Sequence, residues 1–256
     1  PACAITEPAD NSASSSGDLV QFKGTAEDVD VPSDWLAVEW SSDKDGVIGN
    51  STPASDGNIA FNFSGLSVET HVITMSVSDE VGATCTTFIT HTVGTPPKLA
   101  IISPASGDVV NEGELATFSA TVSDDQDAPP DIALEWSSSL DGVFSTQGAD
   151  STGKAEFTDN TLTTGTHSLT VTATDPDGLF TTALVTFEVN GLPTAPGISL
   201  KPNPADTNDD LNVSIDTPST DLEGDPITYT YAWTKNGTAS SASTSATLPK
   251  SATAKG

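Results

Sequence analysis

The chain repeats itself along its length. When the sequence is shifted by 96 positions, residues 3–9 fall on 99–105 and residues 38–42 fall on 134–138, with no gap between the two matches. A long repeat without insertions or deletions indicates two copies of one structural unit. Any fold assigned to the first copy must therefore also suit the second.

A third copy follows the second but differs from it. Its first strand is predicted at 198–200 and its tryptophan strand at 229–233. It is shorter than the other copies between its proline and its tryptophan, and the sequence ends before counterparts of the last two strands. About 100 residues suit one compact module. We therefore predict three domains, at 1–95, 96–191 and, incomplete, 192–256.

Apolar residues alternate with polar ones within each copy, as expected of strands that bury one face. Asp-Gly turn signals separate these stretches. Seven or so short strands in each copy describe an immunoglobulin-like (Ig-like) β-sandwich. The predicted inward residues are Val20, Phe22, Ala26, Leu36, Val38, Trp40, Ile73, Met75 and Val77 in the first copy, and Ala116, Phe118, Val122, Ile132, Leu134, Trp136, Leu169, Val171 and Ala173 in the second.

The links between the copies are short and rich in proline. They lie at 94–97 and 191–196. Proline fixes the backbone angle φ and favours extended, stiff connections. The predicted fold class is therefore all-β, with tandem Ig-like sandwiches in an extended rod.

The charge excludes some partners. The chain has 8 Lys and Arg against 36 Asp and Glu, for a formal net charge of -28, which repels phosphate backbones and anionic lipid surfaces. It also has no apolar run near 18 residues and no signal peptide. We expect no nucleic-acid partner and no direct membrane insertion, and interpret the chain as a segment of a longer secreted or cell-surface polypeptide.

Several motifs resemble a known group of proteins. A tryptophan strand followed by Asp-Gly, and a Thr-His strand that ends in Asp-x-x-Gly, resemble the PKD-like and cadherin-like Ig modules of large bacterial surface proteins. The segment 219–226 before the third tryptophan strand strengthens this resemblance. Such modules serve as stalks, adhesins or fibre subunits, which the resemblance implies here. It specifies the fold better than the function.

Acidic residues gather in two loops of the first two copies, before the tryptophan strand and before the last strand, and in the first of these loops in the third copy. In an Ig-like topology these loops share one end of the sandwich, where their carboxylates suit calcium. The alternative is that acidic turn residues only cap loops and keep the surface solvated. The candidate calcium ligands are Asp28, Asp30, Asp79, Asp124, Asp125, Asp175, Asp177, Asp221, Glu223 and Asp225.

Two cysteines occur, both in the first copy. Cys3 and Cys85 correspond to Leu99 and Thr181 in the second. If the first strand runs parallel to the last, these cysteines lie side by side, so we predict a disulfide in an oxidising compartment. The alternative is two unpaired thiols.

No residue set indicates catalysis. His71 and His167 share one repeat position at a strand start, His91 aligns with Phe187 on the inward face, and no nucleophile signature accompanies the many serines. We predict no catalytic residues and no enzyme.

The four tryptophans fall into two groups. Trp40, Trp136 and Trp233 recur at one strand position and are predicted to be core residues. Trp35 is unrepeated and is the better candidate for an exposed contact.

The leading hypothesis is a non-enzymatic structural or adhesive segment, a stalk or fibre, at the cell surface or outside the cell. Its partners would be other copies or repeats of the same protein, or a cell-surface glycan or protein. One alternative is a set of carbohydrate-binding accessory modules of a secreted hydrolase. A second is a filament subunit that polymerises by strand addition at the incomplete third domain.

Overall fold

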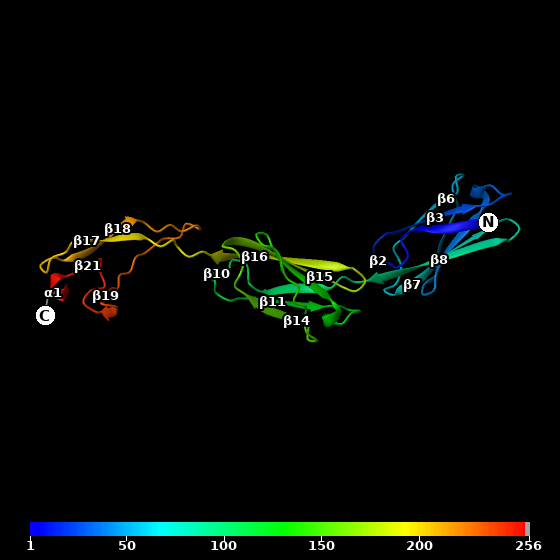
Figure 1. Ribbon diagram of the computed structural model, residues 1–256. Helices are drawn as coiled ribbons and strands as arrows, with labels where there is room; N and C mark the ends of the chain where they lie inside the picture. The colour runs from blue at the N-terminus through cyan, green and yellow to red at the C-terminus, as the bar shows by residue number, and fades with distance from the viewer. Residues whose placement is uncertain (254–256) are drawn as a thin grey trace. The chain divides into compact units, whose positions relative to one another are not determined.

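The computed structural model describes residues 1–253, which form β-strands joined by loops and contain almost no helix (Figure 1). The all-β prediction and the tandem Ig-like sandwiches are confirmed. The chain forms two compact units: one holds Pro1–Ser106, Ala116–Asp159 and Ser168–Phe187, and the other holds Gly107–Leu115, Asn160–His167 and the residues from Glu188 onward. The predicted domain boundaries and the extended rod stay predictions.

The first copy is a sandwich of two sheets, one of three strands and one of five. The first part of the chain contributes to both, because its opening strand ends at Glu7 and a second strand begins at Ser12 in the other sheet. The three-stranded sheet has the order β1 (Ala2–Glu7), β3 (Val20–Glu27), β6 (Asn58–Phe63). The five-stranded sheet has the order β2 (Ser12–Ser15), β8 (Thr84–Gly94), β7 (Thr70–Ser78), β4 (Ala37–Ser42), β5 (Gly46–Ser51).

The core of this sandwich lies between its two sheets. All nine predicted inward residues of the first copy are buried. Trp40 of β4 has no exposed surface, and its ring stacks on Phe61 of β6 from the facing sheet, with ring centroids 5.9 Å apart. Period-2 alternation therefore predicted this core correctly, because successive side chains of a strand point to opposite faces.

The second copy repeats the arrangement. Its nine predicted inward residues are also buried. Its three-stranded sheet has the order β14 (Lys154–Asp159), β11 (Ala116–Ser123), β9 (Lys98–Ser103). Its five-stranded sheet has the order β10 (Val109–Asn111), β16 (Phe180–Asn190), β15 (Gly165–Thr174), β12 (Ala133–Ser138), β13 (Gly142–Ser145).

The third copy has fewer paired strands. The predicted tryptophan strand at 229–233 is wrong in extent, because only Trp233 of it is in a strand. Trp233 is also partly exposed rather than buried in a core. In the first copy the tryptophan strand pairs with β7, but the described part of the third copy pairs Trp233 only within a hairpin, so the backbone of 229–232 lacks a ladder partner.

The strands of the third copy form one sheet and that hairpin. The sheet has the order β17 (Gly197–Lys201), β18 (Leu211–Thr217), β21 (Thr247–Leu248); the hairpin joins β19 (Trp233–Lys235) and β20 (Thr238–Ser240), and a short helix α1 (Lys250–Thr253) follows.

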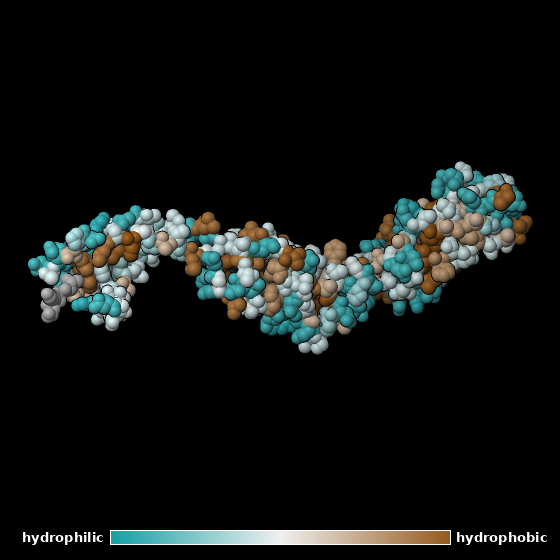
Figure 2. All heavy atoms as spheres, viewed as in Figure 1, coloured by the Kyte–Doolittle hydropathy of each residue, from teal (hydrophilic) through white to brown (hydrophobic). Residues whose placement is uncertain are grey.

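The surface mixes hydrophilic and hydrophobic residues rather than presenting one kind (Figure 2). Large apolar side chains such as Val29, Trp35 and Phe88 are exposed among the polar ones. In the part of the chain that the structure describes, no helix is long and apolar enough to cross a membrane.

Candidate functional site

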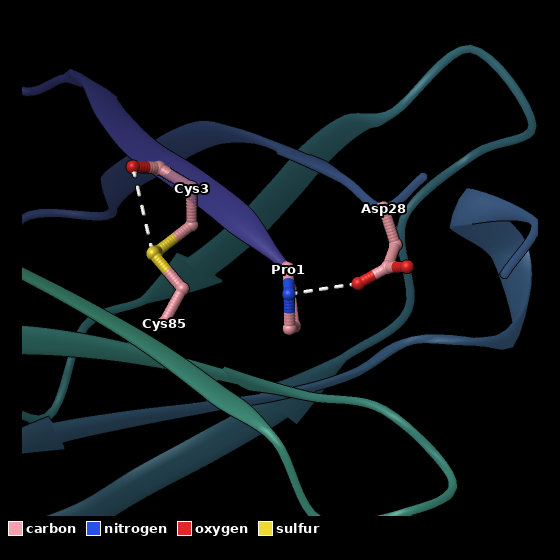
Figure 3. Close-up of a disulfide and its surroundings, with 4 residues drawn as sticks. All are labelled: Pro1, Cys3, Asp28 and Cys85. Atoms are coloured by element: carbon pink, nitrogen blue, oxygen red, sulfur yellow. Dashed lines mark hydrogen bonds and ion pairs between the residues drawn. A yellow bond between two sulfur atoms is a disulfide. The ribbon is translucent and has the colours of Figure 1, made fainter. Parts of the chain in front are cut away.

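A disulfide joins Cys3 of β1 to Cys85 of β8 (Figure 3). The predicted pairing is confirmed, with a Cα–Cα distance of 5.9 Å and a sequence separation of 82. The strand geometry behind the prediction is wrong, however. β1 pairs with β3, and it is β2 that runs parallel to β8, from Ser12 opposite His91. The disulfide therefore links the two sheets rather than neighbouring strands of one sheet.

The acidic loops of the first copy lie close together. Asp28 Oδ2 lies 2.7 Å from the Pro1 nitrogen (Figure 3). The hydrogen bond between the Asp28 and Asp30 carboxyls lowers the pKa of Asp28 and raises that of Asp30. Glu80, next to Asp79 in the loop before the last strand, contributes to the raised pKa of Asp30. The two loops thus lie close together, as expected of loops that share one end of an Ig-like sandwich.

The second copy brings the corresponding loops together. Burial raises the pKa of Asp127, and the carboxylates of Asp124, Asp175 and Asp177 raise it further. Asp124 Oδ1 accepts bonds from the backbone N–H of Gln126 and Asp127, but its Oδ2 is buried without a hydrogen-bond partner among the described residues. An unpaired buried carboxylate oxygen is costly.

Two other predicted calcium ligands of the second copy, Asp125 and Asp175, contact other groups of the protein. The Asp125 carboxylate lies 2.9 and 3.1 Å from Lys98 Nζ. Asp175 is buried, and its Oδ1 accepts the backbone N–H of Leu179. Such contacts are those of acidic residues that stabilise turns.

The third copy has one acidic turn. Asp221 Oδ1 accepts backbone N–H bonds from Glu223, Gly224 and Asp225. Glu223 Oε2 is buried with no hydrogen-bond partner within the described chain. Asp221 therefore organises the turn that holds the other two candidates.

No closed metal site results from these loops. Across residues 1–253, no three His, Cys, Asp or Glu side chains are grouped so that they could hold a metal ion. The histidines make structural contacts instead: His71 Nδ1 lies 2.7 Å from Ser42 Oγ, and both His91 ring nitrogens lie 2.9 Å from serine hydroxyls of β2.

A groove opens on the outward face of the five-stranded sheet of the first copy. Its volume is about 650 Å³, and Trp35 lies along it. Trp35 is 73% exposed, which confirms its predicted exposure. Polar residues from three strands complete the lining, among them Glu39 of β4, Asn50 of β5 and Ser76 of β7.

Sequence reasoning missed Glu39 and Asn50 as site residues. Their positions opposite the inward stripe indicated that they face outward, but only the strand register places Asn50 and Ser76 on either side of Glu39.

The comparisons with known proteins agree with the sandwich geometry. Residues 97–171 match the family model of a bacterial Ig domain. No curated protein matches the sequence. The match confirms the resemblance to Ig-like repeats of bacterial proteins, and it supports a module of the structural or adhesive kind.

Solved structures with similar folds come from varied proteins. The fibronectin(III)-like modules of Clostridium thermocellum CbhA are 18% identical, with 74% of this chain and 95% of that chain covered and a TM-score of 0.48. The I-band fragment I67-I69 from titin is 11% identical, with coverages of 91% and 85% and a TM-score of 0.40. A marsupial T cell receptor is 10% identical, with coverages of 90% and 89% and a TM-score of 0.48.

Proposed function

We propose that this chain is a non-enzymatic structural or adhesive segment of a bacterial protein located at the cell surface or outside the cell. The observation that carries the proposal is the repetition of one complete sandwich, with the same buried positions in both copies. Repeated modules extend a protein and present its surfaces. The match to a bacterial Ig domain supports the class.

The disulfide supports the location. Disulfides persist in oxidising compartments and are rare in the reducing cytosol. Cys3 and Cys85 are both partly buried, and neither is free. A bond that closes 82 residues of the first copy suits a module that works outside the cytoplasm.

The location is tested by labelling intact cells of the source bacterium. Antibodies should detect the chain on intact cells or in the culture medium. After acid trapping, a maleimide added to the denatured chain at neutral pH should modify neither cysteine until a reductant is added. Detection only after lysis, with both thiols free, would contradict the proposal.

Calcium remains part of the proposal for the second copy. The support is the unpaired Asp124 Oδ2 beside other carboxylates, since a hard cation would satisfy that oxygen. The loops would have to close further to supply enough ligands, because no ligand group is already formed among the described residues.

Thermal unfolding with calcium and then with excess chelator, at fixed salt, tests this proposal. A ligand that binds only the folded state raises the midpoint. We expect a calcium-dependent rise that Asp124→Asn removes and that the control Asp125→Asn, whose carboxylate pairs with Lys98, leaves intact. Equal midpoints in calcium and chelator would leave these carboxylates as turn caps.

A further inference from the structure

Local contacts hold the backbone of Trp35, and its side chain is exposed. It ends a 3-10 turn, Ser33–Trp35, in which its N–H donates to the Pro32 carbonyl at 2.9 Å. The next residue, Leu36, is 1% exposed and anchors the turn to the core. Because the turn fixes the backbone of Trp35, little loop freedom is lost when the exposed indole makes a contact.

The groove beside Trp35 has a polar floor. Glu39 lies directly opposite Asn50 on one neighbouring strand and Ser76 on the other. Within the described residues, the carboxylate of Glu39 and the amide of Asn50 make no side-chain hydrogen bond. A carboxylate, an amide and a hydroxyl are thus available in one row next to an aromatic ring.

The second copy has the same groove without the tryptophan. This groove, of about 440 Å³, is lined by residues of β12 and β15 and of the segment that follows β13, and it includes Glu135. The same 3-10 turn, Pro129–Asp131, places Asp131 at the position of Trp35. Thr146 replaces Asn50, and the exposed Phe180 does not line the groove. Both copies therefore have the groove, but only the first copy has a tryptophan beside it.

We propose that the Trp35 groove binds a neutral saccharide chain. The flat indole matches the apolar C–H face of a pyranose ring, and the polar floor matches its hydroxyl groups, as in sites that combine an apolar surface with a few polar groups. No Lys, Arg or His lines the groove, so it offers no charge for sulfated or uronic-acid chains. The row of polar residues also differs from the apolar centre of a protein interface.

This inference rests on the adhesive part of the proposed function, for which it names a partner class. The probes are neutral polysaccharides: β-1,4-glucan, xylan, mannan, chitin and an α-glucan, each immobilised and tested for retention of the full chain. We expect at least one to retain the chain, and its soluble hexasaccharide to change the tryptophan fluorescence.

Matched variants locate the site. Trp35→Ala should weaken binding at least about tenfold, as truncation of a central aromatic contact does, and Glu39→Gln should weaken it less. The equivalent changes in the second copy, Asp131→Ala and Glu135→Gln, should leave binding unchanged. Trp35 is exposed, so its removal should not unfold the protein, and an unchanged thermal midpoint checks this.

Two results would overturn the inference: retention on none of the polysaccharides, or retention that Trp35→Ala does not weaken. Either result would leave the structural role standing, because labelling of intact cells tests that role separately.

Discussion

The first two copies bury the same strand positions but place different side chains at some of them. In the first, Trp40 and Phe61 stack with their planes 14° apart, and a Cβ at Gly49 would overlap the Phe61 ring. In the second, Trp136 and Phe157 meet edge to face at 85°, and Ser145 stands in the place of Gly49. The absence of one side chain therefore accompanies a different ring geometry.

A second pair of positions shows the same exchange. Gly24 is adjacent to Met75 in the first copy, where a methyl group on Gly24 would press against the methionine sulfur. The second copy has Ala120 and Val171 at these positions, both fully buried. A larger residue on one strand is balanced by a smaller one on the other. At this pair of positions the buried pattern is kept, and the change in volume on one strand offsets the change on the other.

The largest difference is the disulfide, and replacing it with the residues of the second copy tests its contribution. The double variant Cys3→Leu, Cys85→Thr should lose up to about 4.5 kcal/mol of stability in the first copy, the chain-entropy value for a loop of this length. Hydrogen exchange resolved by peptide measures β7 and β15 separately. Faster exchange in β7 alone is expected, and equal acceleration in β15 would show that the effect is not confined to one copy.

Gly49→Ser places the residue of the second copy under the Phe61 ring. The ring must move, and overpacking of a buried site typically costs about 1–3 kcal/mol. The reciprocal control, Ser145→Gly, removes no such contact and should cost less. Urea unfolding followed by fluorescence measures both. If Gly49→Ser left the free energy of unfolding unchanged, the stacked geometry would not depend on the glycine.

His91→Phe gives the first copy the aromatic residue of the second, since Phe187 occupies the same position. His91 and Phe187 contact Phe22 and Phe118 edge to face in the same way. The variant leaves the hydroxyls of Ser12 and Ser14 without their hydrogen-bond partner. This loss should lower the free energy of unfolding by about 1 kcal/mol at neutral pH.

The His91→Phe effect should also depend on pH. Burial lowers the pKa of His91 below its ordinary 6.5. As the pH falls through 6.5, His91 takes up a proton in the unfolded chain but stays neutral in the folded chain. The wild type therefore loses stability as the pH falls. The advantage of the wild type over the variant should therefore shrink from pH 8 to pH 5. Urea unfolding across this range measures it, and a constant difference would mean that His91 has the same pKa in both states.

Much of the fold could be predicted from the sequence, because alternation determines which face of a strand is buried. Phe22 and Phe118, or Trp40 and Trp136, needed no other information. The sheet to which a strand belongs is a different matter. Alternation does not show that β1 and β2 lie in different sheets, so the disulfide was predicted correctly from the wrong strand pairing.

The candidate site was less predictable for a related reason. Trp35 stood out because the repeat lacks it, and that signal was enough to predict exposure. Glu39, Asn50 and Ser76 are far apart in sequence, and only the register of three strands makes them one row. The acidic loops were visible in the sequence, but whether a carboxylate oxygen caps a turn or remains unpaired depends on local backbone geometry.

The central prediction is that the two copies of one sandwich unfold as separate modules, the first of which is locked by a bond between its sheets. Stretching single chains from both ends measures this directly. With the disulfide intact, the stretch between the cysteines, which are 82 positions apart, cannot extend. Reduction should lengthen one of two unfolding events by about 280 Å, at about 3.4 Å per residue, and leave the other unchanged. Unfolding without two separate events, or events that reduction does not change, would contradict the account.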